Sequence, residues 1–336
     1  MFAVRPHQEA VRHGGGLKAA SIAHPDINGP WLDLSTGINP EPYQGHAAPL
    51  SALGRLPDPF ELQELERVAA AFFLTTPDRV AAAPGAEAII RLLPVLLGKS
   101  TIDVVGPTYG THTEIWQAAQ LAPLVISADK AASSRADILV IVNPNNPDGY
   151  RFQRDELLKI LSAREAQNRW LVVDESFGEC VPELSMSNVV SDRLIVLRSF
   201  GKFFGLAGVR LGFALASPDF KAALRTLTGD WPVSADAIAL GSQAYADNRW
   251  ISQNTKRLLA RSKLMAEILE GAGFEMVGGT SLFLLTRHTR AQDWFWTLCR
   301  RGILTRPFDH ADDLLRFGLP SEADLPRLRH ALAAGI

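Results

Sequence analysis

The sequence predicts an α/β fold in which helices cover a mostly parallel central sheet, together with a smaller α+β domain. Strand-length apolar runs alternate with helical patterns as far as residue 217, the order typical of a parallel sheet. From Pro218 onward the pattern becomes mainly helical. The length of 336 residues allows one large and one smaller domain. We therefore expect a large domain over residues 46–217, and an N-terminal segment, 1–45, that joins a small C-terminal domain, 218–336.

The large domain is expected to alternate between helices and strands. Apolar residues recur at three- and four-residue spacing across residues 60–74, which predicts a helix. A short strand at 79–83 then leads into a second, apolar helix at 88–97. The remaining expected elements are a strand at 101–105, a helix near 111–119, and strands that end at Val142, Val173, Leu197 and Ala216.

The C-terminal part is expected to contain a long helix and several short strands. The helix covers residues 252–271. Strand-like runs follow at 281–286, 303–305 and 314–317, with helices at 291–301 and at the C-terminus. This mixture is typical of a small α+β domain.

Composition argues against several classes of protein. The net charge of −2 gives no basic surface for nucleic acid or a membrane. No apolar run reaches the roughly 18 residues of a spanning helix, so we expect a cytoplasmic protein. Cys180 and Cys299 have no CxxC spacing and predict neither a disulfide framework nor a zinc site. His112 and the other histidines lack metal-ligand spacing, and we interpret them as surface or core residues.

One lysine lies between two strand-like runs. Lys202 follows the apolar run 194–197 and precedes the run 211–216, among glycines that let a ligand approach the backbone. Ser199 and Arg210 flank it as donors suited to a phosphate. A lysine that forms a Schiff base beside a phosphate site indicates pyridoxal phosphate.

Two upstream motifs also follow predicted strands. Asp174 ends the apolar run 170–173, so a buried strand would present a carboxylate at its carboxyl end, where open α/β sheets bind ligands. Such an anion would keep a pyridinium nitrogen protonated, although an Asp that caps a turn explains the pattern as well. The segment 143–149 contains two prolines and a glycine and predicts a rigid turn that could aim the Asn146 amide at a ring's phenolic oxygen.

The tripeptide Gly85-Ala86-Glu87 lies where a strand passes into a helix. Backbone N–H groups and the positive end of the helix dipole meet there, which suits a phosphate dianion. An ordinary helix start is the alternative.

Three segments carry a resemblance to a known family. Residues 143–149, 174–177 and 199–212 resemble the fold-type I pyridoxal-phosphate enzymes of the class I/II aminotransferase superfamily. His13-Gly14-Gly15-Gly16 and residues 32–40 are similar to the cobalamin-pathway threonine-phosphate decarboxylases, whose close relatives are the histidinol-phosphate aminotransferases. The resemblance covers nearly the whole chain and implies pyridoxal 5'-phosphate as the cofactor.

The resemblance also implies a role for each cofactor-binding residue. Lys202 would form the Schiff base, Asp174 would pair with the ring nitrogen, and Tyr109 would stack on the ring. Asn146 would bind the phenolic oxygen, and the residues nearest the helix start would bind the phosphate. The full implied set is Gly85, Ala86, Tyr109, Asn146, Asp174, Ser199, Lys202 and Arg210.

Substrate-binding residues are expected at the two ends of the chain. By family position, Arg316 would hold an α-carboxylate near the Asn39 amide, with Arg306 closer to a substrate phosphate. The N-terminal glycines could present N–H groups to that phosphate, with added charge from Lys18. A flexible N-terminal loop and surface arginines are the alternatives. The expected residues are His13, Gly14, Gly15, Asn39, Arg306 and Arg316.

The chain departs from the family pattern at two positions. Phe177 stands where the family often has a tyrosine that helps to bind the phenolic oxygen, so Asn146 would be the main donor. Leu56 replaces the tyrosine of a Tyr-Pro-Asp motif that reaches the neighbouring subunit's cofactor phosphate. We expect a homodimer, and whether the neighbouring subunit completes the site stays open.

The resemblance implies three functions. The first is decarboxylation of L-threonine O-3-phosphate to (R)-1-aminopropan-2-ol O-phosphate and carbon dioxide in cobalamin biosynthesis. The second is a histidinol-phosphate-type aminotransferase, because a rotation about one bond of the substrate separates the two reactions. The third is a partner subunit that acts with an amide-bond-forming enzyme of cobalamin assembly.

Overall fold

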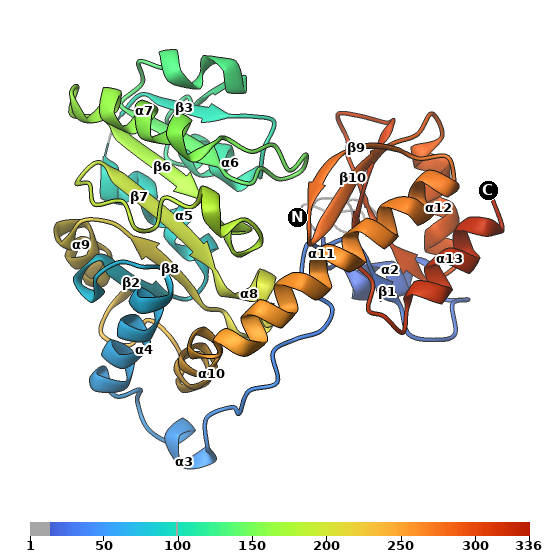
Figure 1. The fold of residues 1–336 in the computed structure, drawn as a ribbon, viewed down its shortest axis with the longest axis horizontal. Coiled ribbons are helices and arrows are strands. Elements are labelled where there is room, and N and C mark those ends of the chain that lie inside the picture. The colour runs from blue at the N-terminus through green and yellow to red at the C-terminus, as the bar shows by residue number, and fades with distance from the viewer. Residues whose placement is uncertain (1–13, 99) are drawn as a thin grey trace, which may run out of the picture. The chain divides into compact units, whose positions relative to one another are not determined.

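The computed structural model describes residues 14–98 and 100–336, which form two compact units (Figure 1). Of the described residues, unit 1 comprises 14–41, Pro147–Gly149 and Gln253–Ile336, and unit 2 comprises 42–98, 100–146 and Tyr150–Ser252.

The division differs from the expected boundary after residue 217. Residues 218–252 belong to unit 2, because α10 (Ala235–Ala246) packs on α4 (Pro59–Phe72), and α9 (Pro218–Thr228) packs on α5 (Ala86–Leu97). Their helical pattern was visible in the sequence, but the unit to which they belong was not.

Unit 2 is built on a seven-stranded sheet with the order β2-β8-β7-β6-β5-β3-β4. Five adjacent strands run parallel to one another, in the order β4, β3, β5, β6 and β7, whereas β8 is antiparallel to both β7 and β2. The prediction of a mostly parallel central sheet is confirmed. The strands are β2 (Val80–Ala83), β3 (Ile102–Val105), β4 (Leu124–Ile126), β5 (Ile138–Val142), β6 (Trp170–Asp174), β7 (Leu194–Ser199) and β8 (Gly212–Leu215).

Helices cover this sheet, and the sequence shows why they form. The strand β5 reads Ile-Leu-Val-Ile-Val and is buried along its whole length, as parallel strands are. One face of the sheet packs against α5, α6 (Thr111–Ala118) and α9. The Asp58 side chain caps α4, with Pro59 at its first position, and a Gln153/Glu156 capping box starts α7 (Arg154–Glu165). The short helices are α3 (Leu50–Leu53), α8 (Phe200–Phe203), η1 (Pro77–Arg79), η2 (Ala128–Ser133), η3 (Gly178–Cys180), η4 (Pro182–Leu184) and η5 (Ala207–Val209).

Unit 1 contains a four-stranded antiparallel sheet with the order β12-β13-β10-β9, and a parallel pair of β1 with β11. The long helix α11 (Asn248–Gly271) begins in unit 2 and continues into unit 1. The other elements are α2 (Leu17–Ala23), β1 (Leu32–Asp33), β9 (Glu275–Thr280), β10 (Phe283–Arg287), α12 (Ala291–Arg300), β11 (Ile303–Leu304), β12 (Arg306–Pro307), β13 (Leu314–Gly318) and α13 (Leu325–Ala333).

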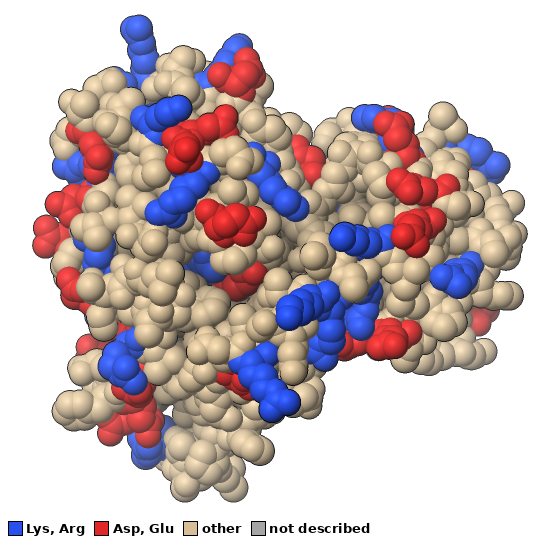
Figure 2. Space-filling model, viewed as in Figure 1, with Lys and Arg blue, Asp and Glu red and all other residues tan. Residues whose placement is uncertain are grey.

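Charged side chains of both signs are interspersed over the face shown in Figure 2. Among the described residues, no helix combines the length and the apolar character that crossing a membrane requires.

Candidate functional site

Three of the predicted motifs meet at one edge of the central sheet. Asn143 follows β5, Asp174 ends β6, and Ser199 ends β7. The register pairs Val142 with Asp174 and Asp174 with Leu197, so the carboxyl ends of the three strands lie side by side. This is the edge at which open α/β sheets bind their ligands.

Asp174 is a buried anion with several donors. Its side chain is 2% exposed. Its Oδ1 accepts the Ser176 N–H at 2.9 Å and the Ser176 hydroxyl at 2.6 Å, and its Oδ2 lies 2.8 Å from His112 Nε2. Burial acts to raise the pKa of Asp174, but the hydrogen bonds from His112 and Ser176 outweigh it and hold the pKa below its ordinary value. Asp174 therefore caps a local turn and is held in its ionised form, while its pairing with a ring nitrogen stays a prediction.

His112 is the main residue of the site that the sequence analysis missed. It is fully buried on α6, as a core histidine would be, but it contacts Asp174. Its Nδ1 has no hydrogen-bond partner among the described residues. Since an ionised carboxylate only accepts hydrogen bonds, the Nε2–H of His112 is the donor to Asp174. The only available signal was its position three residues after Tyr109.

Tyr109 lies in the loop between β3 and α6. Its hydroxyl donates to Glu87 Oε2 at 3.1 Å, and its ring packs edge-on against the His112 ring at 6.2 Å. Burial raises the pKa of Tyr109, and the nearby Glu87 carboxylate adds to the effect. The phenol therefore stays neutral, as a ring that stacks on another ring should.

The start of α5 forms a cradle for an anion. Gly85 has a positive φ of 92°, and a Cβ at that position would lie 2.8 Å from the Arg210 guanidinium. A Cβ on Gly212 would lie 2.3 Å from the Ala86 nitrogen. Both glycines are therefore needed for the helix start, the strand β8 and the Arg210 side chain to approach one another. Helix N–H groups beside a guanidinium suit a phosphate dianion.

Lys202 lies on α8, directly after β7. Its side chain is half-buried, and its Nζ is 5.8 Å from the centre of the Phe177 ring. Unit 2 thus provides a lysine amine, an ionised carboxylate and a cradle for an anion, while Asn146 follows β5 in the same unit. These residues fit pyridoxal phosphate, which needs an amine for its aldehyde, an anion for its ring nitrogen and donors for its phosphate.

A second group of charged residues lies in unit 1. Arg306 on β12 and Arg316 on β13 are register partners, and Arg316 is 7% exposed. Burial, the neighbouring Arg306 charge and, in the opposite sense, Asp33 together lower the pKa of Arg316 to about 10. Burial also lowers the pKa of Arg306. Two adjacent cations that both pay for burial favour an anionic ligand.

The N-terminal glycines lie next to this pair through Ser35. Gly15 N–H donates to the Ser35 hydroxyl at 2.8 Å, and Arg316 donates to the Ser35 carbonyl at 2.8 Å. A Cβ on Gly14 would lie 2.4 Å from the same carbonyl oxygen, so only glycine fits there. Ser35 lies within the segment 32–40 that carries the family resemblance, but it was not predicted as a site residue. His13 lies outside the described residues.

Asn39 is buried at 2% exposure in the same unit. Its Oδ1 accepts the Glu41 N–H at 3.0 Å, and its Nδ2 donates to Asn254 Oδ1 at 3.1 Å. These two bonds fix the orientation of the Asn39 amide. The structure therefore brings Gly14, Gly15 and Arg316 together around Ser35, with Arg306 beside Arg316 in the sheet and Asn39 on the same segment as Ser35.

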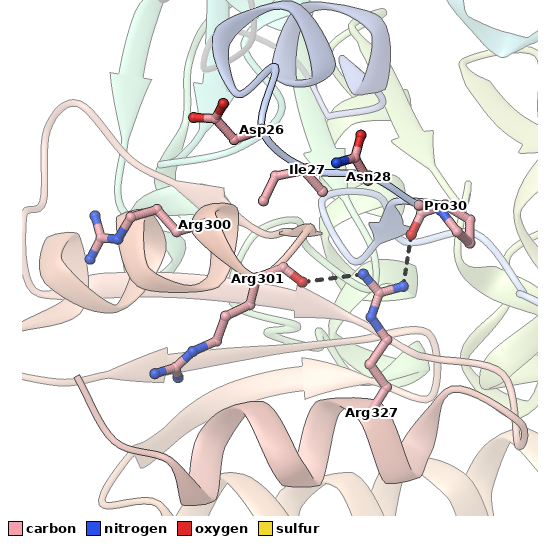
Figure 3. Close-up of a pocket in the computed structure, with 8 residues that line it drawn as sticks. Asp26, Ile27, Asn28, Pro30, Arg300, Arg301 and Arg327 are labelled. Carbon is pink, nitrogen blue, oxygen red and sulfur yellow. Dashed lines mark hydrogen bonds between the residues drawn. The ribbon is translucent and has the colours of Figure 1, made fainter.

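A separate hollow of about 450 Å³ in unit 1 is lined by Arg300, Arg301 and Arg327 (Figure 3). Arg327 donates to the backbone carbonyls of Pro30 at 2.8 Å and Arg301 at 3.2 Å. Its charge is thus used within the fold, and none of the predicted residues lines this hollow. Within the described part of the chain, no group of His, Cys, Asp or Glu side chains could hold a metal ion.

Comparisons with known proteins agree with this geometry. The chain is 39% identical to a threonine-phosphate decarboxylase of Sinorhizobium sp, over 96% of this chain and 98% of the relative. It is also 39% identical to the threonine-phosphate decarboxylase of Pseudomonas aeruginosa, over 96% and 97%. A histidinol-phosphate aminotransferase from Sinorhizobium meliloti, solved in complex with pyridoxal-5'-phosphate, has the same fold. Its TM-score is 0.81 at 18% identity, over all of this chain and 97% of that one. The model of the aminotransferase class I and II family matches residues 44–332, and the chain therefore belongs to that family.

Proposed function

We propose that this chain is a pyridoxal-phosphate-dependent carboxy-lyase. It converts L-threonine O-3-phosphate into (R)-1-aminopropan-2-ol O-phosphate and carbon dioxide, a step of cobalamin biosynthesis. The similarity to threonine-phosphate decarboxylases over almost the whole chain supports this reaction. The observation that carries it is the buried Arg316 with the half-buried Arg306 beside it, next to the N-terminal glycines, which matches a substrate with both a carboxylate and a phosphate.

In this proposal each side chain has a defined task at the reacting centre. Lys202 would hold the cofactor through its amine, and Lys202 or water would deliver a proton to Cα. Asp174 keeps the ring nitrogen protonated, and His112 keeps Asp174 ionised and oriented. When bound, pyridoxal phosphate supplies an electron sink for the electron pair that the broken Cα–carboxylate bond leaves at Cα. Carbon dioxide departs, and the proton from Lys202 or water completes the amine product.

Substrate orientation decides which bond breaks. Arg316 holds the α-carboxylate, with Asn39 near it, and Arg306 and the glycines hold the phosphate. Decarboxylation requires the Cα–carboxylate bond to stand perpendicular to the cofactor ring, whereas transamination requires the Cα–H bond there. A phosphate-substrate aminotransferase is therefore the alternative, since histidinol-phosphate aminotransferases are more distant relatives with the same fold.

We further propose that the protein is a homodimer. Unit 2 exposes large apolar side chains on and around α3, among them Leu50 at 84% and Phe60 at 78%. Leu53 and Leu56 are exposed between them. Leu56 cannot donate a hydrogen bond to a neighbouring cofactor phosphate, so its part in a dimer would be burial of apolar surface. A cytoplasmic location and association with an amide-bond-forming enzyme stay predictions.

One assay tests the proposed reaction. Purified protein with added pyridoxal phosphate is incubated with L-threonine O-3-phosphate, and both carbon dioxide and the amine are measured. We expect equal amounts of the two products. Formation of a keto acid without carbon dioxide would identify an aminotransferase instead, and no product from the loaded protein would refute both reactions.

A further inference from the structure

The turn after β5 is held by unit 1, although the strand itself belongs to unit 2. The chain leaves unit 2 after Asn146, joins unit 1 for Pro147–Gly149, and returns to unit 2 at Tyr150. Asn146, the expected donor to the cofactor's phenolic oxygen, is thus one peptide bond away from a segment that packs with the small unit.

The contact that holds this turn is made between backbones. A Cβ on Gly278 of β9 would lie 2.1 Å from the Asp148 carbonyl oxygen. From the other side, a Cβ on Gly149 would lie 2.2 Å from the Gly279 carbonyl oxygen. Real Cβ atoms essentially never approach closer than 3.0 Å, so both glycines are required. The strand β9 itself contains two adjacent glycines, Gly278 and Gly279. Glycines weaken a strand, and they commonly mark the close approach of another backbone. We call these four residues the glycine seam.

On its other side Asn146 is held by unit 2. The neighbouring Asn145 accepts the Thr108 hydroxyl at 2.6 Å and donates its amide to the Pro107 carbonyl at 3.0 Å. Its backbone N–H donates to the Tyr150 carbonyl at 2.8 Å and closes the turn. Pro147, whose ring fixes φ, follows Asn146 directly, so a displacement of Asp148 is passed along the chain rather than absorbed there.

We propose that Gly149 and Gly278 are positioning residues for Asn146, acting through the glycine seam. The proposal rests on the proposed cofactor site. It assigns to β9 a function besides pairing with β10: the strand fixes the turn that aims the Asn146 amide. Any side chain at position 278 must push the Asp148 carbonyl away and thereby misplace the donor to the phenolic oxygen.

The test is the pH titration of the bound cofactor's absorbance, without substrate, in Gly278→Ala. A phenolic oxygen that loses one hydrogen-bond donor has its negative charge offset less. It therefore holds more tightly the proton that it shares with the Schiff-base nitrogen of Lys202. We therefore expect the midpoint to move to higher pH by about 0.5–1 unit, the equivalent of one hydrogen bond. Asn146→Ala should cause a similar shift, and the double variant should show no additional shift. The matched control is Gly271→Ala, because a Cβ there meets no atom within 4 Å. It should leave the midpoint unchanged.

Each outcome decides between the proposals. A wild-type protein that does not bind pyridoxal phosphate refutes the cofactor site itself. If it binds the cofactor, an unchanged midpoint in Gly278→Ala or in Asn146→Ala overturns only the inference. Shifts that add in the double variant also overturn it, because the effect would then bypass Asn146.

A second measurement covers the case in which Gly278→Ala does not fold. Hydrogen exchange of the cofactor-free wild-type protein in mild denaturant compares the Asn145 amide with the amides of β9. If the seam holds the turn, the Asn145 amide should become exposed together with β9. Independent exchange of the two would contradict the proposal.

Discussion

Replacing His112 by leucine should weaken the proposed site by a predictable amount. The imidazole makes one hydrogen bond, to Asp174 at 2.8 Å, and its Nδ1 has no partner among the described residues, so the substitution removes a single hydrogen bond besides the ring contact with Tyr109. A buried hydrogen bond to a charged group is worth about 1.5–3 kcal/mol. Asp174 would then stabilise the protonated ring nitrogen less, by up to this free energy. The difference corresponds to a roughly 10- to 100-fold loss of turnover or cofactor affinity.

His112→Gln is the matched control, because its side-chain amide keeps a donor near the position of Nε2. The assays are carbon dioxide release and the dissociation constant of pyridoxal phosphate for wild type and both variants. The expected order is wild type, then the Gln variant, then the Leu variant. Equal activity and cofactor affinity in His112→Leu and wild type would refute the coupling between His112 and Asp174.

Stability of the cofactor-free protein gives an independent measure of the same bond. The pKa of Asp174 lies below its ordinary 3.8 in the folded protein. Its contribution to stability is therefore present above about pH 4 and is lost as the pH falls through the folded-state pKa. The difference in unfolding free energy between the Gln and Leu variants should be largest near pH 7 and should shrink in acid. A difference that does not depend on pH would point to packing alone.

Three further variants test separate parts of the site. In Lys202→Ala, mass spectrometry should no longer detect the covalent cofactor adduct that borohydride fixes in wild type. An adduct retained in the variant would mean that another residue binds the cofactor. Arg316→Ala should weaken L-threonine O-3-phosphate and L-threonine alike, by about 10- to 100-fold, whereas His13→Ala should weaken mainly the phosphorylated ligand. Equal losses in His13→Ala would remove the phosphate-cradle interpretation. Phe60→Glu should shift the protein from dimer to monomer in sedimentation, because it places a charge on the exposed apolar surface; an unchanged dimer would place the interface elsewhere.

The sequence predicted those parts of the site that lie at strand ends. Asp174 and Lys202 follow apolar runs that are long enough to identify, and a parallel sheet necessarily brings such ends together. It did not predict His112, because a single histidine on a helix has no spacing that distinguishes a core residue from a partner of Asp174. It also missed β9, since two adjacent glycines, of which the turn requires Gly278, give the strand the composition of a loop. The position of residues 218–252 depended on packing between α10 and α4, which no local pattern encodes.

The adjacent pair of Arg306 and Arg316 has a consequence for product release. In the proposed reaction the substrate arrives with a carboxylate for one guanidinium and a phosphate for the other. Loss of carbon dioxide removes the carboxylate while the phosphate stays. The charge of Arg316 is then offset less, and its repulsion from its register partner returns. Decarboxylation itself thus lowers the affinity of the site for the phosphorylated amine that remains. This amine should dissociate more readily than the amino acid from which it was made.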